Sequence, residues 1–183
     1  LANLKQLSLA FMMYADDYEG WLPKSWATTS EPVYWMDAVA PYIARQAGTG
    51  WKDWQKFPTA FLCPSDRKMF SKFSLSSRGG CSYGMNYYLG ENYNPHVASR
   101  RFHKISEIKN ASKFVLLGET DYSAILAGAT QASLHSYTGP YPAGVPDYHN
   151  GGSCYLFFDG HCEWLKYIPS YAEDKNIWAP WIP

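Results

Sequence analysis

The sequence predicts a mixed α+β chain in which a long N-terminal helix packs on a small antiparallel sheet. Apolar residues recur at spacings of three and four through the first 18 residues, which is the pattern of an amphipathic helix. A short apolar run occupies 113–118, and two more flank an Asp-Gly pair at 159–160, which is typical of strands and a hairpin. Gly-, Pro-, Ser- and Tyr-rich stretches between these elements predict loop-rich insertions.

The length and charge of the chain limit the kinds of protein it can be. Its 183 residues suit a single domain, which we divide into the helix 1–19, a variable middle 20–110, and a sheet with a C-terminal loop, 111–183. Sixteen basic residues balance sixteen acidic residues, so we expect no nucleic-acid partner. No apolar stretch in this sequence reaches the about 20 residues that span a bilayer.

The first helix is predicted from one apolar stripe. Its members are Leu4, Leu7, Phe11, Tyr14 and Tyr18. Gly20 suits the C-terminal end of this helix and Pro23 prevents its continuation. The segment starts without an initiator Met or a capping residue, so we expect the helix to begin upstream of Leu1. A second, shorter helix is predicted at 34–48, with a bend at Pro41.

The final hairpin is predicted from Asp159-Gly160 between two apolar runs. These residues favour a two-residue type I′ turn, which needs positive φ at both central positions. That turn pairs Phe157 with Cys162 and fixes which side chains share a face. The cleaner apolar face, which we expect to meet the long helix, then carries Tyr155, Phe157, Cys162 and Trp164.

The four cysteines lie outside any CxxC pair, which does not favour a zinc ribbon. An even number of cysteines suits an oxidising compartment. In the predicted hairpin register Cys154 and Cys162 point to opposite faces, so they should not form a bond. We therefore expect a disulfide between Cys63 and Cys81, which both lie in loop-like sequence.

His149 and Asp159 are the main candidate site residues, and several roles remain open for them. The favoured interpretation is architectural: each stabilises its own turn, with Asp159 accepting bonds from nearby backbone N–H groups. The alternative is a divalent-cation site that uses His149 or Asp159 with Glu119 or Asp121, with calcium expected before zinc. The sequence offers no set of nucleophile, base and orienting group, so we expect no catalytic residue, no enzyme and no required cofactor.

Five sequence blocks, taken in order, resemble a large bacterial family. The closing block has His149, nine intervening residues and then Asp159-Gly160. The earlier blocks are 3–23, FLCPSD at 61–66, SYGMN at 82–86 and VLLGET at 115–120. Together they resemble the prepilin-type, processing-associated proteins with an H-X9-DG motif, which are related to type II secretion pseudopilins. The resemblance covers nearly the whole chain and is loose at 24–60 and 121–147.

This resemblance implies a structural subunit of a type II secretion pseudopilus, in the general secretion pathway of protein transport, or of a type IV pilus-like filament. The implied partners are like subunits, other pseudopilins, and a prepilin peptidase that acts on the full-length precursor before its methylation. An upstream hydrophobic helix, continuous with residues 1–19, would anchor the subunit in the inner membrane with a periplasmic head. Related major pseudopilins carry calcium in a C-terminal loop, but their ligands do not map onto this sequence.

Two other classes of protein remain open. The abundant aromatic residues suit a surface carbohydrate-binding module, provided that the rings are exposed for stacking on sugars. Its candidate residues are Trp26, Trp35, Trp51, Trp54, Trp178 and Trp181. The second alternative is a metal-dependent hydrolase around His149, which requires three convergent ligands and an open coordination position.

Overall fold

The computed structural model describes residues 1–23, 26–27, 33–44, 59–66, 81–86, 104–119 and 149–166. Its elements in chain order are α1 (Ala2–Asp17), β1 (Trp26–Ala27), β2 (Val33–Tyr34), α2 (Trp35–Ile43), the 3-10 turn η2 (Thr59–Phe61), β3 (Tyr83–Met85), the 3-10 turn η4 (Ile105–Glu107), β4 (Val115–Glu119), β5 (Ser153–Phe157) and β6 (Cys162–Leu165). The mixed α+β class is therefore confirmed.

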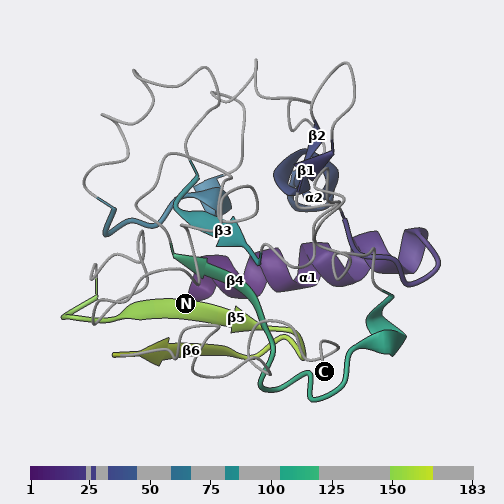
Figure 1. Ribbon diagram of the computed structural model, residues 1–183. Helices are drawn as coiled ribbons and strands as arrows, with labels where there is room; N and C mark the ends of the chain where they lie inside the picture. The colour runs from purple at the N-terminus through teal and green to yellow at the C-terminus, as the bar shows by residue number, and fades with distance from the viewer. Residues whose placement is uncertain are drawn as a thin grey trace.

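The main sheet has four antiparallel strands in the order β3-β4-β5-β6. Figure 1 shows α1 running along this sheet, with β5 and β6 on one side of the helix and α2 on the other. The β4–β5 pairing shifts between Val115 and Leu117, which is a β-bulge. A bulge changes the alternation of side chains, so Leu116 and Leu117 both enter the core. The strands β1 and β2 form a separate two-stranded sheet.

The first helix is shorter than predicted. It spans 16 residues, and Leu1 before it makes no side-chain capping bond. At its end Glu19 has a φ of 54°, and the Gly20 N–H donates to the Ala15 carbonyl at 2.7 Å. This bond is the one that closes a Schellman motif, in which Glu19 takes the left-handed position after the cap and Gly20 follows it with a φ of 82°. No helix in the described segments combines the length and apolarity needed to cross a membrane.

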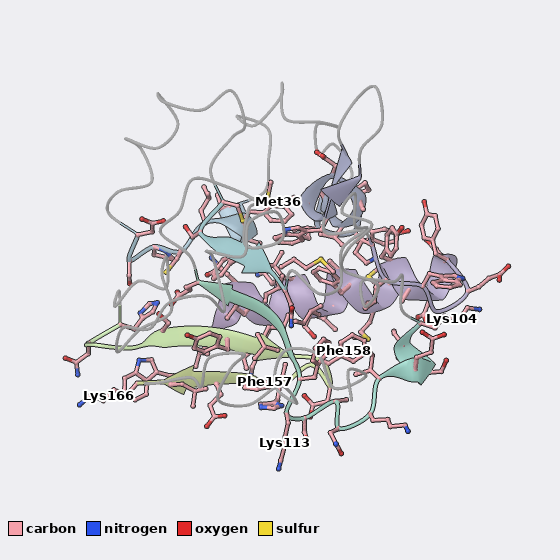
Figure 2. All side chains as sticks on the ribbon, in the orientation of Figure 1. Met36, Lys104, Lys113, Phe157, Phe158 and Lys166 are labelled. Carbon is pink, nitrogen blue, oxygen red and sulfur yellow. The ribbon has the colours of Figure 1, made fainter. Side chains whose placement is uncertain are left out.

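One core joins α1, α2 and the sheet. Phe11 of α1 stacks on Trp35 of α2 with ring centroids 5.5 Å apart, and Trp35 contacts Phe61 at 5.7 Å. Met36 and Phe158 also belong to this core, and they lie on opposite sides of α1 (Figure 2). Full burial of such a side chain stabilises a fold by about 1.5–3 kcal/mol. The buried face of α1, which carries Phe11, therefore fixes the orientation of the helix.

The second helix and the strands lie close to their predicted positions but have different bounds. The helix α2 ends at Ile43, and its predicted end at Gly48 falls outside the described residues. Pro41 lies inside α2 and removes the backbone bond to the Asp37 carbonyl, so the helix extends only a short way beyond it. The strand predicted at 113–118 is β4, which begins later and includes Glu119.

The hairpin of β5 and β6 forms where the sequence predicts it, but the predicted register is wrong by one residue. The structure pairs Leu156 with Cys162 and Cys154 with Trp164. The predicted face is also wrong, because the side chains that join the α1 core from this hairpin are Cys154, Leu156 and Phe158. The predicted helix-facing residue Tyr155 lies on the other face of β5, because neighbouring residues of a strand alternate in direction.

The turn explains this shift. The Phe157 N–H donates to the His161 carbonyl at 2.9 Å, and the Gly160 N–H donates to the Phe157 carbonyl at 3.0 Å. Within the turn positive φ occurs at Gly160, with a value of 88°, and not at Asp159. The connection is therefore a three-residue loop, a type I turn followed by a left-handed glycine, and not the predicted type I′ turn.

Candidate functional site

Three segments that are far apart in the sequence meet at one end of the sheet. They bring together Cys63, Glu119 and His149. Each of these residues has one atom that can bind a metal ion, and the three atoms lie within 4.8 Å of one another. The His149 Nε2 lies 2.8 Å from the Glu119 Oε1 and 3.3 Å from the Cys63 Sγ. We refer to these three residues as the Cys63–Glu119–His149 cluster.

A tight turn after η2 positions Cys63. The Asp66 N–H donates to the Cys63 carbonyl at 2.9 Å, which closes a four-residue turn with Pro64 at its second position. Proline favours that position because its ring fixes φ near the value that the turn needs. The Asn3 side chain of α1 donates to the Leu62 carbonyl at 2.7 Å and ties this segment to the beginning of the helix.

Strand β4 positions Glu119. It is the last residue of the strand and pairs with Tyr83 of β3. Its carboxylate is only 1% exposed, and the Cys154 N–H donates to its Oε2 at 2.8 Å. A buried carboxylate is costly without polar partners, so the second oxygen, Oε1, depends on the bond that it makes within the cluster.

The backbone around His149 folds back toward the sheet. Asn150 and Gly151 have φ values of 57° and 78°, which turn the chain sharply before β5. The His149 N–H donates to the Gly152 carbonyl at 3.2 Å, and the Trp164 indole N–H donates to the His149 carbonyl at 2.8 Å. These bonds hold the imidazole at the cluster from both the turn and β6.

The electrostatics of the cluster disfavour a reactive thiol. Burial, followed by the hydrogen bond and charge of Glu119, raises the pKa of the Cys63 thiol to about 11. Burial, followed by the charge of the neighbouring Cys63, also raises the pKa of Tyr83. A nucleophilic cysteine needs a thiol pKa that is lowered. A catalytic histidine forms a hydrogen bond to the nucleophile with one ring nitrogen and to the orienting carboxylate with the other. The His149 Nε2 faces both the Cys63 sulfur and the Glu119 carboxylate, and its Nδ1 lies 3.5 Å from the Ser65 Oγ. The three atoms of Cys63, Glu119 and His149 are close enough to hold one cation.

Asp159 does not join this cluster. Its Oδ1 accepts bonds from the His161 backbone N–H at 3.1 Å and from the His161 Nδ1 at 2.5 Å, within its own turn. Burial raises the pKa of Asp159, but the hydrogen bonds from His161 outweigh it and leave that pKa below its ordinary value. Of the predicted cation ligands, Glu119 and His149 therefore lie together, Asp159 lies elsewhere, and Asp121 falls outside the described residues.

The predicted Cys63–Cys81 disulfide is not formed, and all four cysteines are free thiols. The Cys81 thiol donates to the Phe61 carbonyl at 3.1 Å, while Cys63 points into the cluster. Cys154 and Cys162 lie on the same face of the hairpin, which corrects the predicted parity, and they too are unbridged.

The sequence identifies two members of the cluster and misassigns the third. Glu119 follows a buried strand and His149 precedes the next one, so both are visible as polar residues at strand ends. Cys63 was assigned to a disulfide, because only the tertiary contact with His149 distinguishes it from Cys81. Compared with family models, with curated proteins and with solved structures, the chain matches none of them.

Proposed function

We propose that this chain forms the head of a structural subunit in a type II secretion pseudopilus or a type IV pilus-like filament. The proposal is supported by the five ordered sequence blocks and by a helix that packs along an antiparallel sheet. It gives the chain no catalytic role. Its partners would be like subunits and other pseudopilins.

The observation that carries the proposal is the exposed apolar side of α1. One side of the helix is buried against α2 and the sheet, while Leu9 and Met13 on the outer side remain 66% and 50% exposed beside the polar Lys5 and Gln6. Exposed apolar residues on a packed helix are suited to contact with another protein. Contacts between different surfaces of identical subunits do not close on themselves, so they generate helical filaments.

The proposal includes an upstream anchor. In the related family, a hydrophobic helix continues into the first helix of the head after a prepilin peptidase cuts the precursor. The coding sequence upstream of Leu1 tests this directly, because a membrane helix needs about 20 mostly apolar residues. We expect such a run in frame and adjacent to α1. An initiator codon next to Leu1, or a polar domain in its place, would refute the anchored filament subunit.

The carbohydrate-binding alternative is less well supported. Trp35, one of its six candidate residues, is fully buried in the core against Phe11 and cannot stack on a sugar. The side chain of Trp26 and the other four tryptophans lie outside the described part of the chain. The exposed indole of Trp164 serves a structural contact, since its N–H donates to the His149 carbonyl.

The hydrolase alternative has the convergent ligands that it requires, but their burial favours another use. Cys63 and Glu119 are almost fully buried, and their positions are fixed by the turn after η2 and by β4. Catalytic metals keep an open coordination position for water and substrate, whereas structural metals are enclosed. The cluster supplies three ligands, so the preference for a structural role rests on the burial of Cys63 and Glu119 alone.

A further inference from the structure

We propose that the Cys63–Glu119–His149 cluster binds a single zinc-type transition-metal ion that fastens together three segments of the head. The ligands would be the Cys63 Sγ, the Glu119 Oε1 and the His149 Nε2. This site is independent of filament assembly, because none of the three residues lies on α1.

The first argument is the convergence of three electron-pair donors. A ring nitrogen of histidine carries either one hydrogen or one lone pair. The His149 Nε2 nevertheless faces the Glu119 Oε1 at 2.8 Å and the Cys63 Sγ at 3.3 Å. The Cys63 thiol brings its own hydrogen to the metal-free cluster, whereas a cation between the three atoms accepts an electron pair from each of them.

The second argument is the support around each ligand. The Cys154 N–H fixes the carboxylate of Glu119 through its other oxygen, and the Asp66 N–H closes the turn that holds Cys63. The His149 backbone is held on both sides, by Gly152 and by Trp164. Metal ligands are normally oriented by such outer hydrogen bonds, which reduce the reorganisation that binding requires.

The third argument is charge. A thiolate and a carboxylate together balance the two positive charges of a divalent ion, and a neutral imidazole adds none. In the resulting neutral complex the ion balances the charges of the Cys63 thiolate and the Glu119 carboxylate, which are almost completely buried. On binding, the metal takes the place of the thiol proton, which passes to the solvent.

The donor set selects the kind of metal. Calcium prefers six to eight oxygen ligands, whereas sulfur and imidazole nitrogen suit zinc. In a tetrahedral zinc site, ligand atoms lie roughly 3.5 Å apart. The two measured separations of 2.8 and 3.3 Å need only small adjustments to reach that geometry. The chemistry therefore reverses the order expected from the sequence and places zinc before calcium.

Cobalt provides the test, because Co²⁺ replaces Zn²⁺ in such sites and a thiolate ligand gives it a charge-transfer band. The 183-residue chain is treated with EDTA, freed of chelator and titrated with Co²⁺. We expect a thiolate-to-cobalt band that saturates at one equivalent, disappears when Zn²⁺ is added, and persists in excess Ca²⁺. Zn²⁺ should also raise the Tm by several degrees.

Matched variants locate the ligands. Cys63→Ala and His149→Ala should abolish the band, while Cys81→Ala and His161→Ala should retain it, since Cys81 and His161 lie outside the cluster. Absence of a band from the unmodified chain, or equal loss in Cys63→Ala and Cys81→Ala, overturns the proposal. If Cys63→Ala fails to fold, X-ray absorption of the zinc-loaded unmodified chain decides: one sulfur ligand supports the site, and nitrogen and oxygen alone overturn it.

Discussion

At the scale of single residues, the two halves of the His…Asp-Gly motif have different roles. Asp159 and Gly160 shape the β5–β6 turn, with Asp159 bonded to His161 inside it. His149 instead reaches Glu119 and Cys63 at the opposite end of β5. The residues between His149 and Asp159 include strand β5, which has the Cys63–Glu119–His149 cluster at one end and the hairpin turn at the other.

Gly160 allows a first prediction about stability. Its φ of 88° is unfavourable for a β-branched residue, and a Cβ at this position would lie 3.0 Å from the Ser8 Oγ of α1. We expect Gly160→Val to lower the free energy of unfolding by about 1–3 kcal/mol, measured by urea denaturation. Gly20→Val is the control, because Gly20 has a φ of 82° with no atom within 4 Å of a Cβ. A smaller loss in Gly160→Val than in Gly20→Val would contradict the contact with Ser8.

Asp159 allows a prediction about pH. Because its folded pKa lies below the ordinary 3.8, the ionised carboxylate stabilises the fold above that pH, and the contribution is lost as pH falls through the folded pKa. The effect should be small, since this side chain is 37% exposed. We expect the unmodified chain to be more stable than Asp159→Asn in urea at about pH 6, and the difference to shrink below about pH 4. A difference that does not change with pH would count against an ionic role for Asp159.

At the scale of elements, the hairpin shows what a local pattern can and cannot predict. The Asp-Gly pair correctly places the turn, because both candidate turns need a glycine with positive φ. The pair does not distinguish a two-residue loop from a three-residue loop, and that difference moves the register by one. The shift of one residue moves Cys162 and Trp164 to the face of Cys154 and Leu156, and this is the face that meets α1.

The two sides of α1 should respond differently to mutation. Leu7 is completely buried in the core, whereas Leu9 is exposed on the other side of the same helix. We expect Leu7→Ala to lower the free energy of unfolding by about 2–5 kcal/mol, because it leaves a cavity. Leu9→Ala should change it by less than about 0.5 kcal/mol. Urea denaturation of both variants checks this, and a similar loss in each would show that α1 packs in a different orientation.

At the scale of the whole molecule, the sequence predicts the fold class and the order of the elements, but not the contacts between distant segments. Periodicity and turn residues act over a few positions, so they locate α1, β4 and the hairpin. The meeting of Cys63 with His149 depends on how the segment after η2 packs against the start of α1, where Asn3 donates to the Leu62 carbonyl. No local pattern encodes that contact, so Cys63 was paired with Cys81, the other cysteine in loop-like sequence.

The most direct test of the filament proposal is cross-linking between subunits. A photo-cross-linking amino acid is placed at Leu9 or Met13 on the exposed side of α1, and at Glu163 on β6 as an exposed control. The full-length precursor is then expressed in bacteria that contain a prepilin peptidase. We expect Leu9 and Met13 to give a ladder of covalent multimers and Glu163 to give little. Monomers alone at all three positions, or equal cross-linking at all three, would contradict a filament built through α1.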